Sequence, residues 1–125
     1  MDEHLTIRLH HTQGAVVVAL SGEVDIDTAP DLRRSAHQLV DEGHQDLVID
    51  MGDVTFCDST GLSALIGIWH TTREAAGTMS LVAIPDRLHR MITVTGISEL
   101  LPTYPTTAAA LTAHPPPGAG PATGR

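Results

Sequence analysis

The chain has 125 residues, 42% of them hydrophobic, which suits one domain with a substantial core. Fifteen acidic residues against seven arginines and no lysine give a formal net charge of -8, which argues against direct binding to nucleic acid or anionic membranes. The N-terminus lacks the features of a signal peptide, no apolar run is long enough to span a membrane, and the single cysteine forms no internal disulfide. We therefore expect a cytoplasmic protein.

The first two apolar segments predict a β-hairpin. Leu5, Ile7 and Leu9 alternate with polar residues, and residues 15–20 form a continuous apolar run. The connection at residues 11–14 is too short for a parallel crossover, so the two strands are expected to pair antiparallel. A run without alternation is typical of a central strand that is buried on both faces.

The rest of the chain alternates helices and strands. A helix is predicted to begin at Thr28-Ala29-Pro30, where a hydroxyl cap precedes a proline, and to end near Gly43. Further elements are predicted as a strand at 46–51, a helix at 59–75, a strand at 79–84, a helix at 86–95, an edge strand at 101–104 and a weak helix at 107–113. The expected fold class is α/β, with a mixed four- to five-stranded sheet whose later strands are parallel. Residues 114–125, rich in proline and glycine, are predicted to be a disordered tail.

The segment from Val54 to Leu62 places two hydroxyls, those of Ser59 and Thr60, where a strand passes into a helix. At a helix start, unpaired amide groups and the positive end of the helix dipole favour an anion. The turn is therefore suited to a phosphate. Because Asp, Ser and Thr are also the usual N-cap residues, a simple helix cap is the alternative interpretation.

The helix that follows carries no charged residue from Ser59 to Thr72. On a helical wheel, one side is large and apolar, and the other consists of small uncharged residues: Thr60, Ser63, Ala64, Gly67 and Thr71. We interpret the small side as a surface on which a partner docks closely without stranding a buried charge. A helix buried on both sides is the alternative.

Over roughly residues 5 to 113, these features resemble the STAS-domain anti-sigma factor antagonists of bacteria. Ser21-Gly22-Glu23-Val24-Asp25 followed by Thr28-Ala29 is similar to the family's loop before the first helix. The segment from Val54 to Leu62 is similar to its phosphorylation segment, and Gly96-Ile97 also fits. The resemblance implies one STAS domain over residues 1–113, ahead of the tail at 114–125.

The resemblance also implies a partner switch, of the kind that acts in stress response or sporulation. Its phosphorylated residue corresponds to Ser59, with Asp58, Thr60, Gly61 and Asp25 as neighbours. The unmodified protein would bind an anti-sigma factor that is also a serine kinase and supplies ATP, and would thereby free a sigma factor. Phosphorylation would end the binding, and a serine phosphatase would restore it. Partner contacts are expected at Gly22, Glu23, Asp25, Ser59, Thr60, Ser63, Ala64 and Gly67.

Three other interpretations remain. A two-component receiver domain has a similar size, but the chain opens with a hairpin and has no lysine to accompany a phosphoacceptor aspartate. A STAS domain also serves as a regulatory subunit of a transport system or another signalling complex, and a pull-down would distinguish this role. An enzyme is the third: eight histidines invite a metal site, but they follow no ligand spacing, and Cys57 has no evident catalytic partner. We expect no metal, no cofactor and no enzymatic activity.

Overall fold

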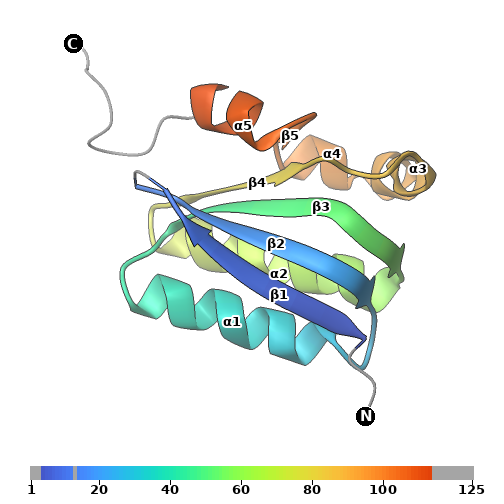
Figure 1. The fold of residues 1–125 in the computed structure, drawn as a ribbon, viewed down its shortest axis with the longest axis horizontal. Helices are drawn as coiled ribbons and strands as arrows, with labels where there is room; N and C mark the ends of the chain where they lie inside the picture. Colours follow the sequence, from blue (N-terminus) through green and yellow to red (C-terminus); the bar gives the residue numbers. More distant parts are fainter. Residues whose placement is uncertain (1–3, 13, 114–125) are drawn as a thin grey trace.

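Five strands form one sheet in the computed structural model, which describes residues 4–12 and 14–113 (Figure 1). β1 (Leu5–His11) pairs antiparallel with β2 (Val16–Val24), which confirms the predicted hairpin. β3 (Asp46–Cys57), β4 (Thr78–Val82) and β5 (Thr103–Tyr104) follow in chain order, each parallel to the strand before it. The predicted mixed α/β fold is thus confirmed. The tail predicted at residues 114–125 lies outside the described residues.

Helices cover both faces of this sheet. α1 (Ala29–Asp41) and α2 (Ser59–Glu74) lie side by side on one face, and α5 (Thr107–Ala113) lies on the other (Figure 1). α3 (Asp86–Val94) and α4 (Ile97–Leu100) connect β4 to β5. The sequence did not predict α4, because four residues are too few to show a helical period. Within the described ranges, no helix is long and apolar enough to cross a membrane.

Two apolar layers hold the sheet and its helices together. The main core lies between the sheet and the α1–α2 pair, and its fully buried side chains include Leu20, Leu32, Ile49, Leu65 and Leu81. A smaller cluster on the opposite face consists of Val17, Val48, Val82 and Ala110. Successive residues of a strand face opposite sides, so a strand buried on both sides requires the continuous apolar run seen in β2 and in the first half of β3.

The strand predicted at residues 46–51 is longer in the structure and continues to Cys57. Its second half still pairs with β2, as far as Val24 opposite Cys57, but two register shifts interrupt the ladder. Beyond Met51 only Val54 and Cys57 are buried, so the apolar pattern that marks the first half disappears. The prediction ended too early because paired backbone, and not side-chain burial, extends the strand.

Candidate functional site

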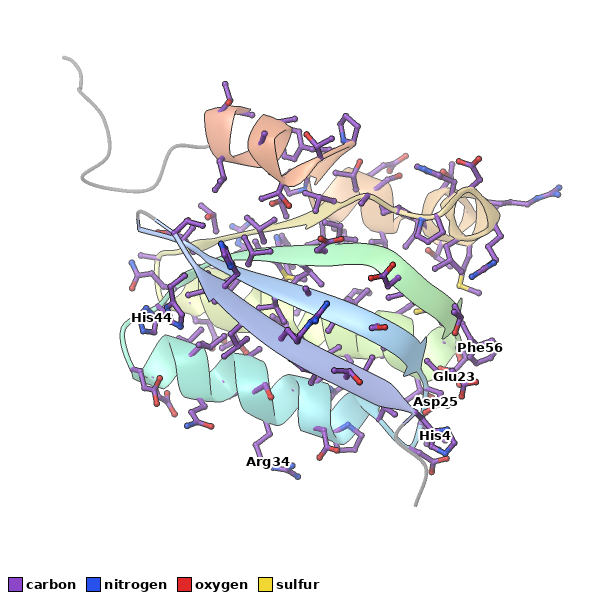
Figure 2. All side chains as sticks on the ribbon, viewed as in Figure 1. His4, Glu23, Asp25, Arg34, His44 and Phe56 are labelled. Carbon is purple, nitrogen blue, oxygen red and sulfur yellow. The ribbon has the colours of Figure 1, made fainter. Side chains whose placement is uncertain are left out.

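The carboxyl ends of β2 and β3 bring together the two segments that the sequence singled out. Val24 and Cys57 are register partners, and the Asp58 amide donates a hydrogen bond to the Val24 carbonyl oxygen at 3.2 Å. From these paired residues, one chain segment turns into the loop at Asp25 and the other into α2. Figure 2 shows Glu23, Asp25 and Phe56 gathered at this end of the sheet.

Ser59 is the first residue of α2 and is exposed. Its neighbour Asp58 is the N-cap: the Asp58 Oδ1 atom accepts a hydrogen bond from the Gly61 amide at 2.9 Å. Within residues 4–12 and 14–113, the Ser59 hydroxyl has no hydrogen-bond partner, and Thr60 is half-buried. The cap and the candidate phosphate acceptor are therefore different residues, so modification of Ser59 leaves the helix cap in place.

Gly61 allows the first turn of α2 to lie directly against the end of β2. A β-carbon at this position would be 2.4 Å from the Val24 carbonyl oxygen and 3.0 Å from the Cys57 Sγ atom. The contact with the backbone oxygen is shorter than a real side chain tolerates, and the contact with the sulfur is unusually tight, so the close approach requires glycine. From the sequence, Gly61 was expected only as a neighbour of the candidate phosphosite, and the structure adds this packing role.

The loop from Glu23 to Thr28 is held by its own polar groups. The Asp25 carboxylate accepts hydrogen bonds from the amides of Asp27 and Thr28, at 3.0 and 3.1 Å. The buried Thr28 hydroxyl donates to the Glu23 carbonyl oxygen at 2.8 Å and accepts from the Asp25 amide at 2.9 Å. The prediction that Thr28 caps α1 through its side chain was wrong, because this hydroxyl is used within the loop. Asp25 is thus placed by a rigid turn.

Gly22 lies where β1 passes very close to β2. Its φ of +117° is a conformation that favours glycine, and a β-carbon would be 2.1 Å from the His4 carbonyl oxygen. The next residue, Glu23, donates its amide to that same oxygen at 2.7 Å, and its carboxylate lies 3.7 Å from the His4 imidazole. On the other side, the Thr55 hydroxyl donates to the Gly22 carbonyl oxygen at 3.2 Å. Gly22 therefore fixes the start of the loop.

The thiol of Cys57 is buried directly beneath the first turn of α2. Burial, together with the smaller effect of the neighbouring Asp58 charge, raises its pKa to about 11. The thiol is therefore protonated at neutral pH and is a poor nucleophile. Cys57 acts here as a small packing residue.

The small side of α2 does not form the open docking surface that the helical wheel suggested. Ala64 is fully buried, so the expectation that it is exposed to a partner was wrong. Gly67 is half-buried and faces α1, because a β-carbon there would be 3.8 Å from the Arg33 guanidinium carbon. Further along, the Thr71 hydroxyl lies 3.2 Å from the His37 Nε2 atom of α1. Small residues let α1 and α2 approach each other, and the alternative of a helix buried on both sides applies to this part of α2.

Two apolar side chains beside the site were missed in the sequence analysis. Ile26, at the tip of the Asp25 loop, is 68% exposed, and Phe56, next to the end of β3, is 48% exposed. Ile26 follows Asp25, and Phe56 follows Thr55. A large apolar side chain directly after a polar residue was the sequence feature that could have indicated an exposed position. Together with the exposed Ser59 and Ser63, they give this end of the molecule a mixed apolar and hydroxyl surface.

Residues 6–110 match the STAS domain family. The chain belongs to this family. The Anti-sigma-B factor antagonist of Bacillus subtilis (strain 168) is 29% identical over 98 residues, which cover 78% of this chain and 89% of that relative. The crystal structure of an anti-sigma factor antagonist from Mycobacterium paratuberculosis aligns with a TM-score of 0.79 at 35% identity, covering 87% of this STAS protein and 92% of the other chain.

A third comparison concerns the Bacillus cell fate determinant SpoIIAA, whose structure is known in the phosphorylated form. It aligns with a TM-score of 0.68 at 19% identity and covers 86% of this STAS protein and 98% of that chain. This likeness shows the fold alone. Because the chain is a STAS domain, the receiver-domain interpretation does not apply to it.

Proposed function

We propose that this STAS protein is an anti-sigma factor antagonist whose binding is switched off by phosphorylation at Ser59. The observation that carries the proposal is the exposed Ser59 hydroxyl, without a partner among the described residues, at the amino end of α2. This hydroxyl lies at the carboxyl ends of β2 and β3, where the Asp25 loop also begins. The names of two relatives support the same function, because both are called anti-sigma factor antagonists.

The proposed partner is an anti-sigma factor that is also a serine kinase and brings its own ATP. It contacts the unmodified end of the molecule through Glu23, Asp25, Ser59, Thr60 and Ser63, and the exposed Ile26 and Phe56 supply apolar contact area. Gly22 and Gly61 shape this surface from beneath, and Ala64 and Gly67 support it through the contact between α1 and α2. A serine phosphatase reverses the modification.

Charge explains why a phosphate at Ser59 would end the complex. A phosphoserine adds about 1.5 to 2 negative charges. The amino end of α2 holds such a group without refolding, because Asp58 already caps the helix. Glu23, Asp25 and Asp58 make the same end acidic before modification. A partner surface that packs apolar groups against the neutral Ser59 hydroxyl would have to desolvate the dianion, and acidic groups on the partner would repel it.

Substitutions at Ser59 test this switch. Ser59→Ala removes the acceptor and adds no charge, so the variant should bind the anti-sigma factor as the wild type does and take up no phosphate. Ser59→Glu should weaken binding by about 1–3 kcal/mol, since it supplies one of the charges of a phosphate. Titration calorimetry measures the affinities, and intact-mass analysis after incubation with ATP and the partner measures phosphorylation.

Ser98 on α4 provides the matched control, because it is an exposed serine near the start of another helix. Ser98→Ala and Ser98→Glu should leave both affinity and phosphorylation unchanged, and circular dichroism checks the fold of all four variants. Equal partner binding by Ser59→Ala and Ser59→Glu, or a phosphate that maps to Thr60, would refute the proposal. A pull-down that recovers a transporter subunit in place of an ATP-binding kinase would support the transport alternative.

A further inference from the structure

A cavity of about 440 Å³ lies at the end of the sheet opposite Ser59. The starts of β3 and β4, the last turns of α2, and α5 surround it, with Leu47, Met79, Leu100 and Leu111 among its apolar lining. Figure 2 labels His44 near this end, where β3 begins, and Glu23 and Asp25 at the other. Its volume lies in the range of about 300–1,000 Å³ that small-molecule sites occupy.

A serine hydroxyl opens onto this cavity. Ser80 on β4 is 7% exposed and lines the cavity, and its hydroxyl has no hydrogen-bond partner within residues 4–12 and 14–113. Because no fully buried side-chain oxygen or nitrogen lacks a partner in the described residues, the Ser80 oxygen itself is accessible from the cavity and can bond to a ligand there. The position therefore favours a ligand that carries an uncharged hydrogen-bonding group.

A positive charge is held at the α2 side of the same cavity. The Arg73 guanidinium lies over the Trp69 ring, 4.9 Å from the ring centroid, and both side chains line the cavity. In the described part of the chain, no carboxylate is within ion-pair distance of Arg73. The ring restricts the guanidinium, so a carboxylate that binds there loses less conformational entropy.

Asp46 limits how much negative charge the cavity accepts. This residue is 6% exposed, and its Oδ1 atom accepts hydrogen bonds from the Thr78 amide at 3.0 Å and the Thr78 hydroxyl at 2.9 Å. Asp46 also lines the cavity. A ligand with several negative charges, such as a nucleotide phosphate chain, would bring like charges together in a region with little water.

We propose that this cavity binds a small amphipathic monocarboxylate. Its single carboxylate pairs with Arg73, its apolar body contacts Met79 and Leu111, and a neutral hydroxyl or carbonyl group bonds to Ser80. The site is separate from the edge that carries Ser59, so its occupancy can be tested without the anti-sigma factor.

Phloretate is a suitable probe because it joins one carboxylate to an apolar ring that ends in a hydroxyl. It should bind the purified full chain with a dissociation constant of about a millimolar or tighter, as expected for a ligand of this size. Calorimetry measures the affinity, and the indole N–H signal of Trp69, the single tryptophan, reports where the probe binds. Tyrosol, which lacks the carboxylate, and hydrocinnamate, which lacks the hydroxyl, should each bind more weakly.

Substitutions test whether phloretate binds specifically in this cavity or is attracted to any arginine on the surface. Arg73→Gln should weaken phloretate about tenfold or more and leave tyrosol unchanged, whereas Arg90→Gln on α3, outside the cavity lining, should change neither. Ser80→Ala should weaken phloretate but not hydrocinnamate, and circular dichroism confirms that the variants are folded. Absence of both binding heat and a Trp69 shift, equal effects of the two arginine variants, or tighter binding of ATP than of phloretate would each overturn the proposal.

Discussion

Single glycines decide how closely the elements around Ser59 approach each other. Gly22 and Gly61 leave no room for a β-carbon, because a backbone carbonyl oxygen occupies the space in each case. Gly67, six residues after Gly61 on the same helix, has its nearest neighbour in the flexible Arg33 side chain, at a distance of ordinary contact. The same amino acid is therefore obligatory at one end of α2 and replaceable in its middle.

This contrast predicts opposite effects of one substitution. Gly61→Ala should lower the free energy of unfolding by about 1–3 kcal/mol, because the new methyl group meets the rigid backbone of Val24. Gly67→Ala should raise it by about 0.5–1 kcal/mol, since alanine favours helix and finds space there. Urea denaturation of both variants measures the difference, and equal destabilisation would show that the contact at Val24 is not the cause.

Among the elements, α2 connects the proposed switch to the core. Its first turn lies on the edge of the sheet with Ser59 exposed, and its middle is buried between the sheet and α1 through Ala64, Leu65 and Ile68. The wheel separated large from small residues correctly, but small residues suit both a partner surface and a close contact between two helices of one chain. Along most of α2, the small residues form the close contact with α1 and not a partner surface.

Adjacent positions on α2 test this assignment. Ala64→Glu should destabilise the protein by about 3 kcal/mol or more, because the carboxylate would be buried without a partner. Ser63→Glu adds the same side chain at an exposed position and should change stability by less than about 0.5 kcal/mol. Thermal unfolding of the two variants measures both effects. A folded Ala64→Glu variant of normal stability would restore the interpretation of this face as a docking surface.

At the scale of the whole molecule, the two ends of the sheet carry different chemistry. The carboxyl ends of β2 and β3 present hydroxyls, acids and exposed apolar side chains on segments that leave the sheet. The starts of β3 and β4 instead enclose a cavity that α2 and α5 complete. In parallel strands, all carboxyl ends share one edge, so residues far apart in the sequence, such as Asp25 and Ser59, meet there.

The sequence predicts that this assembly does not depend on residues 114–125. A chain that ends after Ala113 should have a melting temperature within about 2 °C of the full chain, because a segment rich in proline and glycine has few apolar groups to bury. Differential scanning calorimetry of the two chains makes the comparison. A drop of several degrees would show that the tail contributes to folding stability.

The sequence by itself determined the hairpin, the order of helices and strands apart from the short α4, and the helix start at Asp58 and Ser59, because hydrophobic period, prolines and capping residues act locally. Tertiary structure alone decided the rest. It set the length of β3, which follows from pairing with β2, and the burial of Ala64, which follows from the position of α1. It also assembled the cavity around Ser80 and Arg73 from β3, α2, β4, α4 and α5. These features depend on contacts between segments that are distant in the chain. A local sequence pattern does not specify which distant segment packs against it.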